Sequence, residues 1–166
     1  RFQGREIHEY LLTLAVPESI SLHEYLAQTH TETGDPDQTA WRRTLCIQLG
    51  RQIRRLHQLG FDHRDLKASN FLVRGTGRNN PAPCIVDLEG VRRWPLLPYA
   101  RRCQNLVRLN LSADAHLVFS RTDRLRFLKE YLGDLASIHW KNSWRRLTRL
   151  TINRRRQFER LHKPLR

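Results

Sequence analysis

The sequence contains no methionine and only three cysteines, and both features limit what the chain can be. Cys46, Cys84 and Cys103 are odd in number and far apart, so they predict neither a disulfide framework nor a zinc site, and a reducing cytoplasm is expected. The missing methionine, with Arg1 at the start, predicts that the chain begins partway through a longer reading frame.

Long apolar runs are also absent. No stretch of about 18 apolar residues occurs, which argues against a membrane-spanning helix, and no basic-then-apolar leader indicates secretion. Hydrophobic residues still make up 39% of the 166 residues and aromatic residues 8%, which is enough for a packed core. One domain, or a large part of one, fits this length.

Acidic residues are few and unevenly placed. The chain has 30 Lys and Arg against 16 Asp and Glu, a net charge of +14. Residues 1–40 carry two arginines against seven acids, whereas residues 141–166 carry ten Lys and Arg against Glu159. Such a basic end is typical of a solvated helix face or of a surface for an anionic partner: nucleic acid, a phosphorylated glycolipid or an acidic membrane.

The spacing of apolar residues predicts a mainly α-helical chain. Leu45, Leu49 and Ile53 recur at helical spacing before Gly60, which predicts a helix over residues 39–59. Further helices are expected at residues 21–26, 101–111, 122–132 and 134–161, the last as one or two helices.

Helix boundaries and turns complete this expectation. Ser120 or Thr122 should cap the helix over 122–132 and Gly133 should end it, whereas the polar segment 30–38 is expected to be a loop. Trp140 and Trp144, one helical turn apart, are predicted to lie in the core.

Short apolar runs predict the few strands. Residues 71–73 and 84–86 flank a cluster of turn formers at 75–81, which predicts a β-hairpin with a long tip. A further buried strand is expected over residues 10–16, closed by Pro17. The predicted fold class is therefore mainly α with a small β-hairpin.

Polar residues capable of catalysis lie on either side of this hairpin. The run His63-Arg64-Asp65-Leu66-Lys67-Ala68-Ser69-Asn70 precedes its first strand, and Asp87 follows its second. Because a hairpin folds back on itself, Asp65, Asn70 and Asp87 should converge at its open end, with Lys67 among them.

This set of residues fits phosphoryl transfer, which depends on positioning and on charge stabilisation. Asp65 would orient the acceptor hydroxyl and take its proton. Asn70 and Asp87 would supply the hard oxygen ligands that Mg²⁺ prefers. Lys67 would neutralise charge on the transferred group.

The same residues carry a resemblance to a known family. The run 63–70 matches the protein-kinase catalytic-loop pattern at its His, Arg, Asp, Leu and Asn positions. Residues 9–161 resemble the carboxy-terminal lobe of the protein-kinase-like fold and, more narrowly, are similar to the lipopolysaccharide kinase family of Kdo and heptose kinases. Three features favour that family: Leu88-Glu89-Gly90 after Asp87, Val91-Arg92-Arg93-Trp94 with no Ala-Pro-Glu, and the run 120–132.

The resemblance implies a division of the chain and two cofactors, ATP and Mg²⁺. Residues 1–20 would be the end of the small lobe and the hinge, and residues 21–166 the carboxy-terminal lobe with a basic terminal helix. The amino-terminal lobe would be largely absent, since no Gly-rich loop or strand lysine precedes Tyr10. Backbone groups of Val16, Pro17 and Glu18 would hold the adenine and Lys67 would contact the phosphates.

The resemblance also implies a substrate and a location. The acceptor would be a sugar hydroxyl, on Kdo or heptose, of the lipopolysaccharide inner core, and therefore an anionic glycolipid. The enzyme would be cytoplasmic, with peripheral contact to the inner face of the inner membrane.

Several alternatives stay open at this point. The chain could be a protein Ser/Thr or small-molecule kinase of the same fold, or a catalytically silent scaffold. A basic nucleic-acid-binding module is a further alternative, although such a module would not need the ordered catalytic loop. Glu89 is either a neighbour of the metal site or a structural partner of Arg92 or Arg93.

Overall fold

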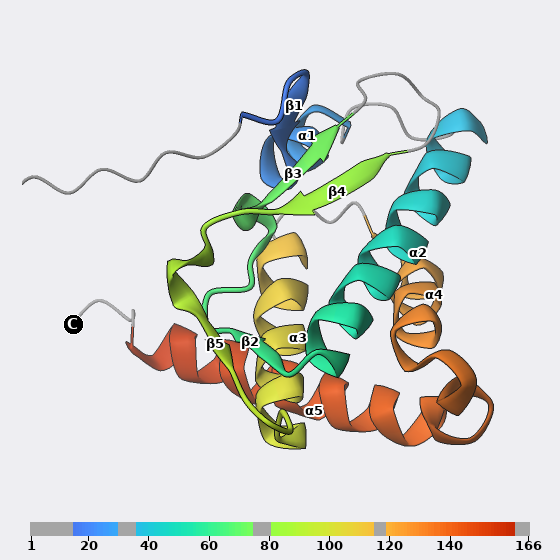
Figure 1. Cartoon of the computed structure of the whole chain (residues 1–166). Coiled ribbons are helices and arrows are strands. Elements are labelled where there is room, and N and C mark those ends of the chain that lie inside the picture. The colour runs from blue at the N-terminus through green and yellow to red at the C-terminus, as the bar shows by residue number, and fades with distance from the viewer. Residues whose placement is uncertain (1–14, 30–35, 75–80, 115–118, 162–166) are drawn as a thin grey trace, which may run out of the picture.

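The computed structural model describes residues 15–29, 36–74, 81–114 and 119–161, and these form a mostly helical body with two small sheets (Figure 1). The helices are α1 (Leu22–Thr29), α2 (Pro36–Gln58), α3 (Tyr99–Asp114), α4 (Arg121–Leu132) and α5 (Ala136–Leu161). The strands are β1 (Ser19–Ser21), β2 (Phe61–His63), β3 (Phe71–Arg74), β4 (Ala82–Ile85) and β5 (Val91–Arg93). The predicted fold class, mainly α with a hairpin, is confirmed.

The core forms around α2. Leu45, Leu49 and Ile53 point inward from this helix and are at most 4% exposed, as their spacing predicts. They pack with apolar residues of α1, β3 and α3. On its other side α2 packs closely against α4. This approach is possible because Gly50 has no side chain: a Cβ atom at this position would lie only 2.7 Å from the carbonyl oxygen of Phe127.

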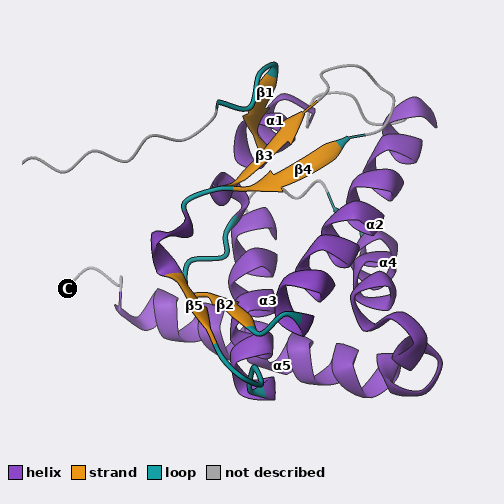
Figure 2. Cartoon of the chain, in the orientation of Figure 1, coloured by secondary structure: helices purple, strands orange, loops and turns teal. Residues whose placement is uncertain are grey.

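The hairpin of β3 and β4 is present as predicted. The two strands pair antiparallel, with Phe71 opposite Ile85, and β1 adds a third strand on the other edge of β3. A second, two-stranded sheet joins β2 and β5, which the sequence did not predict. Figure 2 shows the two sheets in separate places, with β1, β3 and β4 at the top of the view and β2 and β5 lower down, beside α3.

Tertiary contacts explain why the β2–β5 sheet is possible. Each strand has only three residues, too few for a periodic sequence signal. Gly60 starts the connection with a φ of 85°, and its backbone lies against the Trp94 carbonyl, where a Cβ atom would not fit. The Trp94 N–H donates to the Gly60 carbonyl at 2.8 Å and extends the pairing.

The helix predictions are largely confirmed, with corrected boundaries. Ser120 caps α4 and Gly133 ends it, as expected, and Asp123 completes a reciprocal capping box. Residues 36–38 are helical, so the loop expected there is wrong, and α5 is a single helix. The strand expected over residues 10–16 falls mostly outside the described residues, as do the loop at 30–35 and the hairpin tip at 75–80.

The aromatic residues of α5 are less buried than predicted. Trp140 and Trp144 are half-buried, and Lys129 and Lys141 lie near the Trp140 ring at 5.5 Å and 5.7 Å. Phe158, farther along the same helix, is 60% exposed. Helix α5 runs across α3 and α4 (Figure 1), and beyond Thr151 its residues 152–161 are exposed.

Candidate active site

The segment from His63 to Asn70 forms the connection between β2 and β3, and we call it the catalytic loop. Leu66 and Ala68 are fully buried in the core. Asp65 and Lys67 alternate with them and keep half-exposed side chains. The loop therefore has an apolar side that fixes it and a polar side that faces solvent.

Helix α3 holds the loop at both ends. Asn105 accepts a hydrogen bond from the His63 backbone N–H at 3.1 Å, through its Oδ1 atom. The Ser112 hydroxyl accepts one from the Ala68 N–H at 2.8 Å and donates to the Leu109 carbonyl. The two anchors lie seven residues apart on one face of α3, so a single rigid helix sets the position of the loop.

Asn105 belongs to a buried polar network that joins four elements. Its Nδ2 donates to Asp62 Oδ1 at 2.8 Å, and its Oδ1 lies 3.1 Å from His57 Nε2. His57 Nδ1 lies 2.8 Å from the Tyr131 hydroxyl. Because Asn105 Oδ1 is an acceptor, His57 carries its proton on Nε2 and accepts from Tyr131 on Nδ1.

The sequence-predicted residues converge at the open end of the hairpin. Asn70, only 6% exposed, donates from Nδ2 to the Asp65 carbonyl at 2.9 Å, to Asp65 Oδ2 at 3.4 Å and to Asp87 Oδ2 at 3.2 Å. Lys67 Nζ forms an ion pair with Asp65 Oδ2 at 2.6 Å. The amide of Asn70 thus bridges the two carboxylates, and the predicted convergence is confirmed.

Asp87 reaches this point because of the register of the hairpin. Phe71 pairs with Ile85, and the Val86 N–H donates to the Asn70 carbonyl at 3.0 Å, so the residue after Val86 lies beside Asn70. Asp87 itself has a φ of 58° and a ψ of 64°, in the left-handed region. That conformation is unfavourable for a residue other than glycine and marks a position fixed by its surroundings.

The charges of the site are coupled. The hydrogen bond from Lys67 lowers the pKa of Asp65 below its usual value, and Asn70 lowers it further. Asp65 in turn raises the pKa of Lys67, with a smaller contribution from Asp87. At neutral pH Asp65 is therefore an ionised carboxylate next to the Lys67 ammonium group.

The oxygen atoms of this cluster fit a hard divalent cation. Asp87 offers an exposed carboxylate, and Asn70 directs its amide N–H toward both carboxylates, which leaves Oδ1 with only a long contact of 3.5 Å from the Ser69 hydroxyl. Mg²⁺ prefers such oxygen ligands and keeps several of its waters. Within the described residues there is no group of three His, Cys, Asp or Glu that could hold a metal ion, so this site depends on an amide and a carboxylate.

The residues predicted to hold adenine lie away from the catalytic loop. Val16, Pro17 and Glu18 precede β1, and Ser19 donates from its hydroxyl to the Val16 carbonyl at 2.7 Å. Ser19 pairs with Arg74, at the end of β3 that is farthest from Asn70. Four residues of strand, about 13 Å, therefore separate the two groups.

Sequence reasoning missed the residues that hold the catalytic loop in place. Asn105 lies on the helix expected over residues 101–111, Ser112 lies one residue beyond it, and His57 lies on the helix expected over residues 39–59. The one available signal is a polar side chain on the apolar face of a helix, as Asn105 is beside the buried Leu106 and Leu109 of α3. Such a residue needs a buried partner, but the sequence does not say which.

Two further features concern the surroundings of the site. Glu89 forms no ion pair with Arg92 or Arg93, since the ion pairs between described residues are Arg51–Glu130, Lys67–Asp65 and Arg126–Asp123. Arg93 instead lies over the Phe61 ring at 5.9 Å. The structural partnership considered for Glu89 is therefore not formed.

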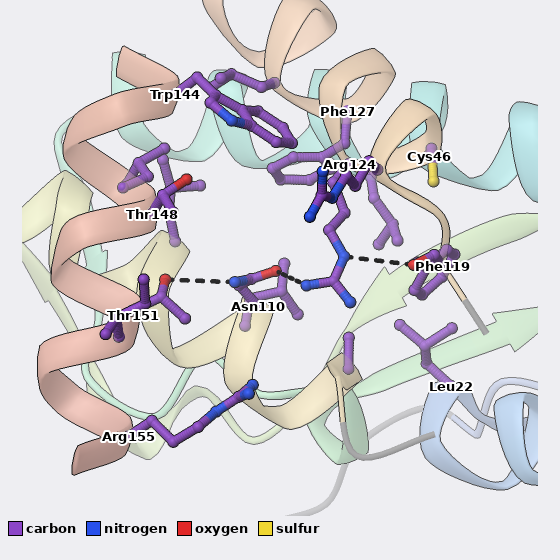
Figure 3. A pocket seen from close by; sticks show the side chains of 18 residues that line it. Leu22, Cys46, Asn110, Phe119, Arg124, Phe127, Trp144, Thr148, Thr151 and Arg155 are labelled. Atoms are coloured by element: carbon purple, nitrogen blue, oxygen red, sulfur yellow. Dashed lines mark hydrogen bonds between the residues drawn. The ribbon is translucent and has the colours of Figure 1, made fainter. Parts of the chain in front are cut away.

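A separate cavity of about 500 Å³ lies between α2, α3, α4 and α5 (Figure 3). Its walls are mostly apolar, and a chain of hydrogen bonds crosses one side, from Arg124 to Asn110 at 3.2 Å and from Asn110 to Thr151 at 3.3 Å. None of the lining residues belongs to the catalytic loop. The cavity is therefore distinct from the candidate active site.

Two known proteins are similar to this chain. Lipopolysaccharide core heptose(I) kinase WaaP of Escherichia coli (strain K12) is 26% identical over 127 residues, which are 75% of this chain and 46% of that protein. The solved structure of WaaP in complex with acyl carrier protein has a TM-score of 0.70 at 23% identity, covering 90% of this chain and 60% of the other. The chain thus spans less than half the length of the curated relative.

The described helices include none that is long and apolar enough to cross a membrane. The sequence profile of the lipopolysaccharide kinase (Kdo/WaaP) family matches residues 2–131, which is more than half of the chain. Because this match covers more than half of its residues, the chain belongs to the lipopolysaccharide kinase (Kdo/WaaP) family.

Proposed function

We propose that this chain carries the catalytic part of a kinase that transfers phosphate from ATP to a sugar hydroxyl of the lipopolysaccharide inner core. Family membership supports a kinase of this class. The observation that carries the proposal is the hydrogen bonding of one amide, Asn70, to both Asp65 and Asp87. A scaffold without activity would not need two carboxylates held together beside a lysine.

Each residue has a role that follows from its surroundings. Asp65 is the base: its lowered pKa keeps it ionised, and its half-exposed side chain can accept the proton of an acceptor hydroxyl. Lys67, paired with Asp65, would neutralise charge on the transferred phosphoryl group. Asn70 and Asp87 are the residues that would hold Mg²⁺, which supplies charge neutralisation for the phosphates.

The binding of nucleotide follows the division proposed for the chain. Residues 1–20 act as the end of a small lobe and its hinge, with backbone groups of Val16, Pro17 and Glu18 near the adenine. Residues 21–166 act as the carboxy-terminal lobe. The four residues of β3 separate this hinge from Asn70, and this length leaves room for a nucleotide that lies along the strand.

The acceptor is proposed to be Kdo or heptose in an anionic glycolipid. The curated relative is a heptose(I) kinase by name, and the basic residues of α5 suit an acceptor that carries phosphates and carboxylates. The work would take place in the cytoplasm at the inner face of the inner membrane. An acyl carrier protein is a further candidate partner, on the likeness to the WaaP complex alone.

The direct test measures transfer of labelled γ-phosphate from ATP to isolated inner-core lipopolysaccharide. In the complete enzyme, Asp65→Asn should lower the rate by at least about 100-fold, as expected for loss of a general base. Asp134→Asn makes the same chemical change at the exposed turn before α5 and should leave the rate within about twofold. A near-normal rate with Asp65→Asn would remove that residue from the role of base.

Two further results would separate the alternatives. Asp87→Ala should abolish Mg²⁺-dependent ATP binding in calorimetry, and unchanged affinity would contradict the metal assignment. If phosphate is transferred to a protein or a small molecule but never to core oligosaccharide, the acceptor is not the glycolipid and the alternative kinase assignment holds. Absence of any transfer by the complete protein would favour the silent scaffold.

A further inference from the structure

A second, open cavity of about 640 Å³ lies on the other side of the fold from the three-stranded sheet, along the first half of α5. Tyr99 at the start of α3 and Leu132 and Leu135 at the turn between α4 and α5 form part of its wall. The rest comes from one stretch of α5: His139, Asn142, Ser143, Arg145, Arg146 and Arg149. None of these residues belongs to the candidate active site, and we call this feature the arginine cavity.

The cavity is strongly cationic. Three arginines line it and no carboxylate does. Between the described residues, neither Arg145 nor Arg149 takes part in an ion pair, whereas Arg51, Lys67 and Arg126 elsewhere do. Over its whole length α5 carries eight basic residues and a single acid, Glu159. An anion is therefore the ligand that this cavity would attract.

Its lining also includes hydrogen-bond donors. The Arg146 guanidinium lies over the Tyr99 ring at 5.0 Å, which holds it at the wall of the cavity. Tyr99 is 53% exposed, and its partial burial raises its pKa, so its hydroxyl is protonated at neutral pH. Guanidinium groups and hydroxyls together match the oxygen atoms of a phosphate group.

Exposed apolar side chains lie beside this cationic cavity. Leu135, in its wall, is 57% exposed, and Ile138, next to the lining residue His139, is 73% exposed. Ile152, 45% exposed, follows on the same helix and also lines the apolar cavity. Ile138, Arg145, Arg149 and Ile152 are spaced by seven, four and three residues, which places them along one side of α5. A free phosphate or a nucleic acid would leave these apolar side chains in water.

We propose that the arginine cavity binds the phosphate groups of anionic phospholipids, so that α5 lies along a membrane surface. Helices that lie at such an interface combine basic side chains for the headgroups with apolar ones that enter the acyl boundary. Arg145, Arg146 and Arg149 bind lipid phosphates, and Ile138 and Leu135 insert beside them. This docking surface lies apart from the catalytic loop, which stays free for nucleotide and acceptor.

Cosedimentation of the chain with vesicles tests the proposal without nucleotide or acceptor, so its failure is distinct from failure of the kinase assignment. We expect binding to vesicles of phosphatidylcholine with an equal amount of phosphatidylglycerol, and far weaker binding to phosphatidylcholine alone. Arg145→Gln with Arg149→Gln should lower the partition by about tenfold or more, since each basic residue near such a surface strengthens binding roughly fivefold. Ile138→Ser should lower it several-fold as well.

The matched control is Arg43→Gln with Arg55→Gln, which removes the same charge from exposed positions of α2. This pair should change the partition by less than about threefold, because charges away from the contact are screened. Equal losses from both pairs would overturn the proposal in favour of unspecific attraction. Binding that inorganic phosphate blocks and that Ile138→Ser leaves unchanged would also overturn it, since it would indicate a site for free anions.

Discussion

The catalytic loop and the outer face of α5 both gather charged side chains, but the tertiary structure fixes them to different degrees. In the catalytic loop, Asn70 alone makes three hydrogen bonds, and α3 anchors the backbone at His63 and Ala68. On α5, residues 152–161 are all exposed. Phosphoryl transfer needs groups held in a fixed geometry, whereas attraction of an anionic surface needs only charge in the right place.

This difference predicts where substitutions will matter for stability, and the largest effect is expected at Asn105. Asn105→Ala leaves Asp62 and the His63 N–H buried without their partner, and each lost partner costs about 1–3 kcal/mol. We expect the free energy of unfolding to fall by about 4 kcal/mol in urea denaturation, together with loss of phosphotransfer. A stable Asn105→Ala variant with normal activity would contradict the anchoring role of α3.

The same network predicts a dependence on pH. Burial lowers the pKa of His57 to about 4, from about 6.5 in the unfolded chain. As the pH falls, the unfolded state therefore takes up a proton before the folded state does. The contribution of His57 to the free energy of unfolding is fully present above about pH 6.5, and the free energy falls by about 3 kcal/mol between there and pH 4. Denaturation midpoints measured across this range for His57→Gln should show a flatter dependence.

Ser112 gives a smaller and more specific test. Ser112→Ala removes the acceptor of the Ala68 N–H, which should lower stability by about 1 kcal/mol. Because Ala68 lies between Lys67 and Asn70, the turnover rate should fall while the KM for ATP changes little. Ser112→Thr keeps the hydroxyl and should restore most of the rate, which a purely structural role would not predict.

The smallest effect on stability is expected on α5. Arg145→Gln and Arg149→Gln alter exposed side chains that form no ion pair with the described residues. The free energy of unfolding, measured by thermal denaturation, should therefore change by less than about 0.5 kcal/mol. A large loss of stability would mean that α5 is held by its arginines, and the contrast with the catalytic loop would disappear.

How far the sequence predicts the site depends on local signals. Asp65, Asn70 and Asp87 were found because they flank a hairpin, and hairpin geometry brings its two open ends together. The β2–β5 sheet was missed because its strands have three residues each. The burial of Trp140 was predicted wrongly because helical spacing shows that a stripe is apolar, but not whether another helix covers it.

The sequence by itself determined the helices, the hairpin and the candidate catalytic residues, because periodicity, turn formers and spacing are local properties of the chain. Only the tertiary structure decided that α3 anchors the catalytic loop through Asn105 and Ser112, and that the arginines of α5 share a cavity with Tyr99. Those contacts join residues more than forty positions apart. Such pairings form through the packing of whole elements, which no local pattern records.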